Sequence, residues 1–172
     1  MGILSGNPKD NPLHYGEIFD IWLCSTTAKG SISIFRALKF HAGDSDLKEV
    51  IGEIINQAEL EVSECDTLLH HNGIAPIATP PERPEAKLEE IPVGARLTDM
   101  EIAPMLAANI AAGLVACSQA MGKSIREDVG VLFEKYHTKK AALGMKVLRL
   151  SKEKGWLMPP PLQIQRPDLV NA

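Results

Sequence analysis

The chain has 172 residues, of which 45% are hydrophobic, 23% are charged and only 5% are aromatic. This length fits one domain, or at most two small ones. The formal net charge of −4 argues against a protein that binds nucleic-acid phosphates or the surface of a membrane. Three dispersed cysteines, Cys24, Cys65 and Cys117, are too few for a disulfide framework and lack the paired spacing of a zinc site. We therefore expect free, buried thiols.

Residues 12–42 are predicted to form the first helix. Asn11 is a favoured N-cap residue, and Pro12 at the first helical position lacks only an N–H group that would have no partner there. Gly43 is a typical stop. The apolar residues of this segment lie on more than one side, so we expect contact with two neighbouring helices.

The second predicted helix, residues 46–72, has the clearest periodic pattern. Apolar residues spaced three and four apart form one continuous stripe, and glutamates occupy much of the remaining surface. The break around Gly43 is only a few residues long, which predicts an antiparallel hairpin with the first helix. The stripe consists of Leu47, Val50, Ile51, Ile54, Ile55, Ala58, Val62, Cys65, Leu68 and Leu69, and the glutamates are Glu49, Glu53, Glu59, Glu61 and Glu64.

Residues 73–97 contain five prolines and show no helical periodicity. Proline restricts the backbone angle φ, so this segment is predicted to be stiff and extended. At about 3 Å per residue such a segment reaches roughly 70 Å. A helix of about 27 residues is only about 40 Å long. The segment is therefore long enough to carry the chain from one end of a helical bundle to the other.

The third predicted helix, residues 98–122, begins with a capping box formed by Thr98 and Glu101. Pro104 lies one turn further on and is expected to bend the helix or to delay its regular part. Residues 102–121 are apolar enough to raise the question of a membrane span. Their bulk comes from alanine and they include several polar side chains, so we expect a helix in the core of a bundle instead.

The fourth predicted helix, residues 124–154, begins with a second capping box, formed by Ser124 and Glu127. Gly155 ends it, and residues 156–172 are predicted to form a tail. Lysines and arginines are interleaved with its apolar stripe. We interpret them as a solvated face, which can equally contact an acidic surface such as the glutamate-rich second helix of another subunit.

Two helical hairpins joined by a long crossover place the second and third helices parallel to each other. This is the connectivity of ferritin-like four-helix bundles with one crossover. The predicted fold class is therefore all-α, a ferritin-like four-helix bundle, with residues 1–172 as a single domain.

Ferritin-like bundles often hold two metal ions, with a Glu from each of two helices and a Glu-x-x-His pair from each of the other two. Residues three apart share one helix face, so Glu134 and His137 can converge on one ion. The rest of the set is missing, which argues against an oxidase centre. A smaller site for a divalent metal or small ligand stays open, in which Glu134 and His137 meet Glu17 or His14. The alternative is that these are surface or core residues without a ligand.

Several segments also carry a family resemblance when they are taken together. They are the opening MGILSGNPK, the segments His14-Tyr-Gly-Glu17, Pro80-Pro-Glu-Arg-Pro84, Ile91-Pro-Val-Gly-Ala-Arg96 and Ser124-Ile-Arg-Glu-Asp-Val129, and the closing Lys154-Gly-Trp-Leu before three prolines. In this combination they resemble an uncharacterised domain-of-unknown-function family of spore-forming bacteria, over nearly the whole chain. The resemblance implies a ferritin-like bundle. Some members are described as putative spore coat proteins, and the family carries no established catalytic residues.

We therefore expect a structural or assembly protein of the spore coat type, more a non-enzyme than an enzyme and without a cofactor. The expected partners are a second copy of the chain or other protein subunits, not nucleic acid or a membrane. Residues 1–11 lack an apolar run behind a basic stretch, so we expect synthesis in the cytoplasm followed by a place in the spore coat. The alternative function is a bundle that binds a divalent metal or a small ligand through Glu134, His137, Glu17 and His14.

Overall fold

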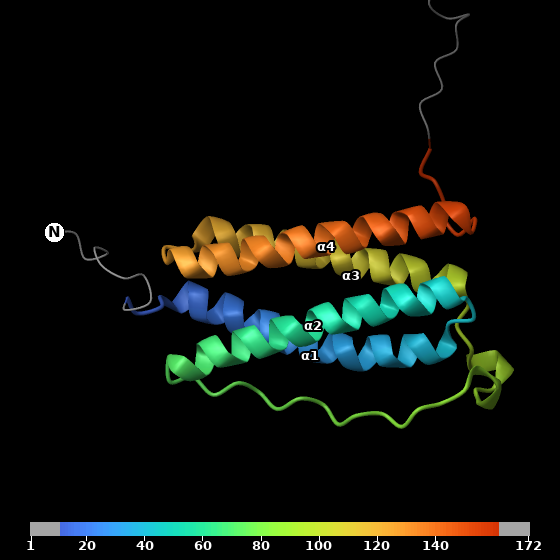
Figure 1. Cartoon of the computed structure of the whole chain (residues 1–172), viewed down its shortest axis with the longest axis horizontal. Helices are drawn as coiled ribbons and strands as arrows, with labels where there is room; N and C mark the ends of the chain where they lie inside the picture. Colours follow the sequence, from blue (N-terminus) through green and yellow to red (C-terminus); the bar gives the residue numbers. More distant parts are fainter. Residues whose placement is uncertain (1–10, 162–172) are drawn as a thin grey trace, which may run out of the picture.

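The computed structural model describes residues 11–161. Residues 1–10 and the part of the predicted tail after residue 161 lie outside the described residues. Four long helices account for most of the described chain (Figure 1). No strand occurs within residues 11–161, which confirms the predicted all-α four-helix bundle. The helices are α1 (Tyr15–His41), α2 (Ser45–His71), α3 (Asp99–Lys123) and α4 (Glu127–Glu153), with two short 3-10 helices before α3, η2 (Leu88–Glu90) and η3 (Val93–Ala95).

The helices form two antiparallel hairpins, α1 with α2 and α3 with α4, and each hairpin turns within three residues. In Figure 1, α1 and α4 run in one direction and α2 and α3 run in the other, because the segment after α2 returns along the whole length of the first hairpin before α3 begins. The predicted crossover is therefore confirmed. The further assignment of the bundle as ferritin-like, and of the whole chain as one domain, stays a prediction.

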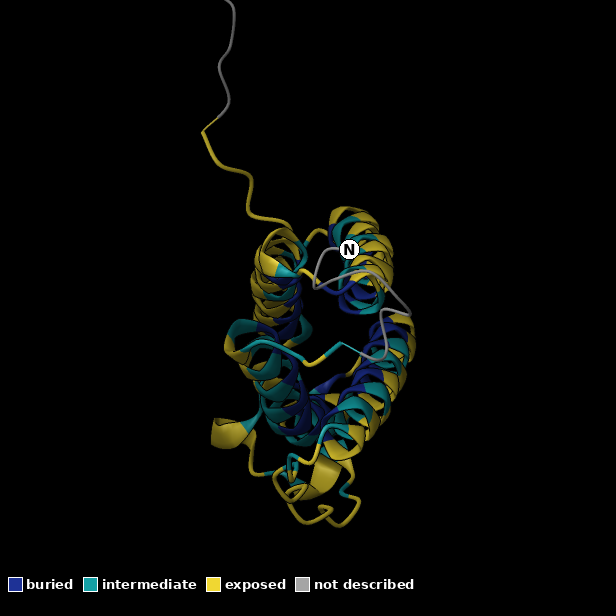
Figure 2. Ribbon diagram, turned by 90° about the vertical axis from the view of Figure 1, so that its left-hand side faces the viewer, coloured by how far each residue is buried: buried dark blue, intermediate teal, exposed yellow. Residues whose placement is uncertain are grey.

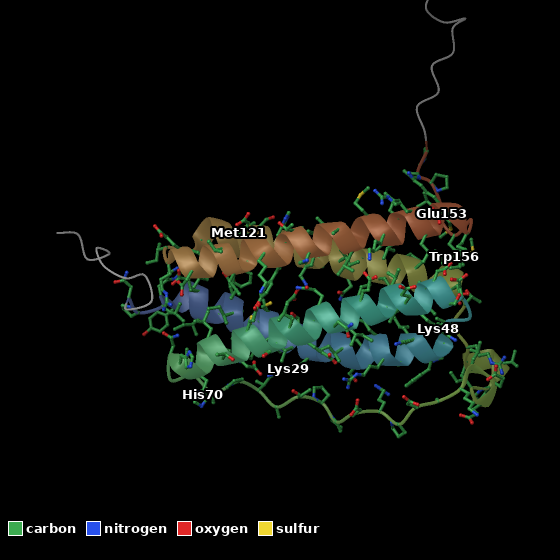
Figure 3. The ribbon with its side chains drawn as sticks, viewed as in Figure 1. Lys29, Lys48, His70, Met121, Glu153 and Trp156 are labelled. Carbon is green, nitrogen blue, oxygen red and sulfur yellow. The ribbon has the colours of Figure 1, made fainter. Side chains whose placement is uncertain are left out.

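The crossover is fastened to the first hairpin by a buried lysine. Lys29 of α1 is only 2% exposed, and its ammonium lies 2.7 Å from an oxygen of Asp66 on α2. The same ammonium donates a hydrogen bond of 2.6 Å to the backbone carbonyl of Ile77, in the crossover that runs past this part of the hairpin (Figure 3). A surface pair between Arg36 and Glu82, at 3.2 Å, holds the crossover further along. The proline-rich segment is thus bound to the bundle by its own carbonyl groups and side chains.

The core consists of two apolar clusters, one toward each end of the bundle, and each draws residues from all four helices. Figure 2 shows the buried stripes of the helices facing inward. The first cluster surrounds Phe35, Ile51, Leu106 and Val147. The second surrounds Ile21, Leu69, Val129 and Phe133. Because both clusters span all four helices, the two hairpins form one packed body within the described residues.

Ion pairs join α2 to α4 along their length. Three lysines of α4 bind glutamates of α2 in the same chain. We had interpreted these lysines as a solvated face or as a contact for another subunit. The pairs are Lys135 with Glu64 at 2.5 Å, Lys140 with Glu61 at 2.8 Å and Lys146 with Glu53 at 2.5 Å. The first and third are partly exposed and contribute little stability, but all three bring the second hairpin into register with the first.

Most of α3 faces outward, which differs from the buried core helix predicted for residues 102–121. A single stripe that includes Ile102, Leu106, Ile110 and Cys117 is buried. By length and composition, Val93–Lys123 could cross a membrane, and only 28% of its most apolar 18-residue window is buried. Pro104 lies within α3 and does not delay its start at Asp99.

Two predicted helix starts are wrong, both by three residues. The first helix begins at Tyr15 rather than at residue 12, and its N-cap is His14 rather than Asn11. The fourth helix begins at Glu127 rather than at residue 124, because Ser124 belongs to the end of α3, where its hydroxyl donates to the carbonyl of Ala120. By contrast, the capping box of Thr98 at the start of α3 is confirmed.

Candidate functional site

His14 and Glu17, two of the four predicted ligand residues, together cap the start of α1. The ring Nδ1 of His14 accepts hydrogen bonds from the backbone N–H groups of Gly16 (2.9 Å) and Glu17 (3.4 Å). The backbone N–H of His14 donates in return to Oε2 of Glu17 (3.1 Å). With Nδ1 accepting, the ring proton lies on Nε2, which is 3.2 Å from the carbonyl of Lys123. Both ring nitrogens therefore already have partners within the protein.

Glu17 also caps the start of α4, which explains why the predicted capping box there does not form. Its carboxylate is 1% exposed, and Oε1 accepts hydrogen bonds of 2.8 Å from the backbone N–H groups of both Ile125 and Arg126. These N–H groups would otherwise be unpaired at a helix start. A carboxylate at this position also interacts favourably with the helix dipole. Glu17 thus links the first turn of α1 to the turn that leads into α4.

An arginine and an aspartate complete this junction, and the sequence analysis missed both. The side chain of Arg126 is 3% exposed and donates to both oxygens of Asp128, at 3.0 and 2.6 Å. It also donates to the carbonyl of Asn11 at 3.0 Å. The guanidinium holds the pKa of the Asp128 carboxyl below its usual range. The pair therefore stays ionised at neutral pH and fixes the segment before α1 onto the start of α4.

The opposite end of the bundle has a similar junction, in which an aspartate of α3 binds the turn between α1 and α2. Asp99, the first residue of α3, accepts hydrogen bonds from the backbone N–H groups of Gly43 (2.8 Å) and Asp44 (3.1 Å). Nearby, Nδ1 of His41 accepts from the backbone N–H of Leu97 at 3.1 Å. Each hairpin turn is thus held by a carboxylate from the first turn of a helix in the other hairpin.

Glu134 and His137, the other two predicted ligand residues, lie on α4 away from this junction. Glu134 is exposed and His137 is half-buried. Within residues 11–161, no three side chains among His, Cys, Asp and Glu come together in a way that could hold a metal ion. Glu17 would also have to give up three backbone hydrogen bonds to become a ligand. Binding of a divalent metal or small ligand by these four residues stays a prediction.

A third ion pair with one buried member lies at mid-height between the hairpins. Glu61 of α2 is 2% exposed, and its Oε2 accepts from the ammonium of Lys140 on α4 at 2.8 Å. Its other oxygen accepts from the side-chain amide of Gln57 at 3.0 Å. A buried charge needs such partners, because leaving one unpaired costs several kcal/mol. We assigned Glu61 to the polar side of its helix, and that prediction is wrong.

The three thiols near this pair are not disulfide-bonded, as predicted. A hydrogen bond with Cys65 and burial raise the pKa of Cys24, and burial raises the pKa of Cys117 to about 12. The thiolate is the nucleophilic form, and the raised pKa values of Cys24 and Cys117 favour the thiol form at neutral pH. Burial likewise raises the pKa of Tyr136, whose hydroxyl lies 3.8 Å from the sulfur of Cys65. These side chains pack the core rather than carry out nucleophilic chemistry.

Comparison with known proteins places this arrangement in a family. The chain is 48% identical to the uncharacterized protein YvdQ of Bacillus subtilis (strain 168) over 166 residues, which make up 96% of this chain and 98% of that protein. It is also similar to a crystal structure of a putative spore coat protein from Bacillus halodurans C-125. That likeness has a TM-score of 0.90 and 46% sequence identity, and it covers 92% of this chain and 100% of that one.

Residues 1–169 match the family described as "Protein of unknown function (DUF3231)". The match covers almost the whole chain and agrees with the family of spore-forming bacteria that the sequence segments resemble. This chain, a four-helix bundle, therefore belongs to the family of unknown function DUF3231.

Proposed function

We propose that the chain is a structural component of the bacterial spore coat that assembles with copies of itself. The observation that carries the proposal is the likeness to the protein from Bacillus halodurans, whose name describes it as a putative spore coat protein. That likeness covers the whole of the other chain at 46% identity, so the two proteins share their complete helical scaffold rather than one motif.

The buried charges of the bundle support a structural role. Glu17 binds backbone groups at the starts of two helices, Lys29 binds the crossover, and Glu61 binds a lysine of the other hairpin. Each of these charges is used to hold one element onto another. The raised pKa values of Cys24 and Cys117 favour their thiol forms, which are poor nucleophiles.

The exposed surface of α3 supports self-association. Between Glu101 and Lys123 this helix has no charged residue, and its outer face, which we define as Ala108, Ala111, Val115 and Ser118, is exposed. Exposed apolar faces of this kind commonly mark contacts between proteins. A second copy of the chain presents the same uncharged, small-residue face, so two copies can approach closely without like-charge repulsion.

A fluorescent fusion expressed during sporulation tests the proposed location. The host is a Bacillus subtilis strain from which YvdQ has been deleted, and the control is the fluorescent protein alone under the same promoter. We expect the fusion to form a ring around the developing spore and to be recovered in the coat extract of purified spores. Fluorescence spread evenly through the mother cell, as in the control, would overturn the proposal.

A further inference from the structure

The bundle contains a cavity of about 320 Å³ at mid-height, between the two apolar clusters. Small residues of α3, among them Gly113, Ala116 and Ala120, line one side of it. Leu23, Cys24 and Thr27 of α1 line another side. Hydrogen bonds link α3 to α1 above and below the cavity. Asn109 donates to Ser31 on one side of it, and Lys123 donates to Asp20 on the other. The small residues of α3 thus leave the space between α1 and α3 unfilled at this level.

One wall of the cavity is polar and is formed by the buried ion pair. Glu61 and Lys140 both line the space. Both oxygens of Glu61 are already occupied, by Gln57 and by Lys140. Among the described residues the ammonium of Lys140 donates only to Glu61. An ammonium group has three N–H donors, so two remain for an acceptor that enters the cavity.

Glycine at position 113 gives Lys140 its path to this wall. A Cβ atom at Gly113 would lie only 2.9 Å from Cδ of Lys140 and 3.5 Å from its Nζ. The lysine stem thus lies directly across the backbone of α3 on its way to Glu61. The charged end of Lys140 is thereby presented inside the cavity while its stem covers apolar surface.

The charges of the lining favour an uncharged occupant. The ammonium of Lys140 is balanced by Glu61, and Asp20 is paired with Lys123 at 2.8 Å. A carboxylate ligand bound to Lys140 would lie beside Glu61 and be repelled by it. A cationic ligand would compete with Lys140 for Glu61. A neutral carbonyl or hydroxyl oxygen can accept from Lys140 without either penalty.

The remaining lining includes the polar residues Thr27, Ser31, Asn109 and Gln119, but its apolar part is larger and favours an apolar body of moderate size. Phe35, Ile54, Ile110, Phe133 and Leu143 contribute apolar walls. An apolar cavity of about 150 Å³ is large enough to bind benzene, so this cavity has room for about two fused rings. We propose that it binds a small uncharged molecule, of about two rings, whose single carbonyl or hydroxyl oxygen accepts a hydrogen bond from Lys140. This inference is independent of the proposed spore coat function.

Two nearly isosteric probes test the proposal through their charge. The ketone 2-acetylnaphthalene carries a neutral carbonyl on a naphthalene ring, and 2-naphthoate places a carboxylate at the same position. Titration of the purified full chain, followed by ligand-observed NMR, should show saturable binding of the ketone at one site and binding of the carboxylate at least tenfold weaker. Absence of saturable ketone binding, or equal binding of the two probes, would overturn the proposal.

Two sets of variants locate the binding. Ala116→Phe fills the cavity and should abolish binding of the ketone, and Ala142→Phe, at an exposed alanine of α4 outside the cavity, should leave it unchanged. In a Glu61→Gln background, chosen so that removing the lysine leaves no buried carboxylate unpaired, Lys140→Met should weaken ketone binding at least tenfold, because it removes a charged donor. The proposed site is wrong if Lys140→Met has no effect in that background. It is also wrong if Ala116→Phe and Ala142→Phe bind the ketone equally well. The Lys140 comparison decides the matter if Ala116→Phe does not fold.

Discussion

Charged residues at positions that belong to the apolar stripes hold this bundle together. Glu61 follows Ala58 by three and precedes Cys65 by four, so it shares their helix face. Lys140 follows Tyr136 by four and precedes Leu143 by three, so it also lies in register with a buried stripe. Their spacing is a signal that sequence reasoning could have used, because a charge in register with a buried stripe has to find a partner inside the protein.

The identity of each partner could not be predicted from the sequence. Glu61 and Lys140 are 79 residues apart, and Glu17 and Arg126 are 109 residues apart. Local rules of capping and periodicity relate residues within a turn or two, so they contain no information on such pairs. The metal-site prediction had the same weakness, since it inferred from type and spacing that His14 and Glu17 could meet a ligand, and their atoms are engaged in caps.

The Arg126–Asp128 pair gives the stability of the protein a defined dependence on pH. Hydrogen bonds from the guanidinium lower the pKa of Asp128 in the folded state. A carboxyl group whose pKa is lower in the folded state stabilises the fold above its unfolded-state pKa, about 4, and this contribution disappears as the pH falls through the folded-state pKa. Asp128→Asn should therefore lower the free energy of unfolding by about 1 to 3 kcal/mol at pH 7. Urea denaturation monitored by circular dichroism measures this difference, which should shrink as the pH falls below about 4 and through the lowered pKa of Asp128.

The control for this experiment is Glu134→Gln, which neutralises an exposed carboxylate on the same helix. Its effect should stay within about 0.5 kcal/mol at every pH. A loss of stability in Asp128→Asn that is equal at pH 7 and at low pH would show that the carboxylate charge does not act as described.

At the level of the helices, local signals predicted the four C-terminal ends to within one residue and two of the starts poorly. The start of α3 was correct because Thr98 and Glu101 cap it with groups only three residues apart. The start of α4 was wrong because the residues just before it, Ile125 and Arg126, donate their backbone N–H groups to Glu17 on another helix. The start of α1 was wrong because an imidazole nitrogen of His14 takes the capping role that Asn11 was expected to have.

Removing the Glu17 carboxylate should weaken α1 and α4 together. Glu17→Ala leaves three backbone N–H groups without their acceptor, so we expect a loss of about 2 to 4 kcal/mol in the free energy of unfolding. Amide hydrogen exchange of Ile125 and Arg126 should also become faster. The matched control is Glu134→Ala on the exposed face of α4, with an expected change within about 0.5 kcal/mol. Unchanged exchange at Ile125 and Arg126 would contradict the role assigned to Glu17.

At the level of the whole molecule, the two hairpins are held by related contacts at opposite ends. Glu17, in the first turn of α1, binds the turn between α3 and α4. Asp99, in the first turn of α3, binds the turn between α1 and α2. The topology could be predicted because the proline-rich segment is too long and too stiff for a short turn. The outward exposure of α3 could not, since an alanine-rich helix has the same composition whether it is buried or not.

That exposure connects the fold to the proposed assembly. In the proposed assembly, a second copy binds the exposed, uncharged face of α3 that contains Ala108, Ala111 and Val115. A single charge on this face should prevent close approach of two copies without disturbing an exposed helical position. Ala111→Glu introduces such a charge, and Ala142→Glu introduces the same charge on the exposed side of α4.

The most direct measurement is the amount of each protein in the coat extract of purified spores, compared with the amount in the mother-cell lysate. The wild type and Ala142→Glu should be recovered in the coat extract. Ala111→Glu should be found in the lysate, with the same thermal unfolding temperature as Ala142→Glu. Recovery of Ala111→Glu in the coat at the wild-type level, or absence of the wild type from the coat, would contradict the account.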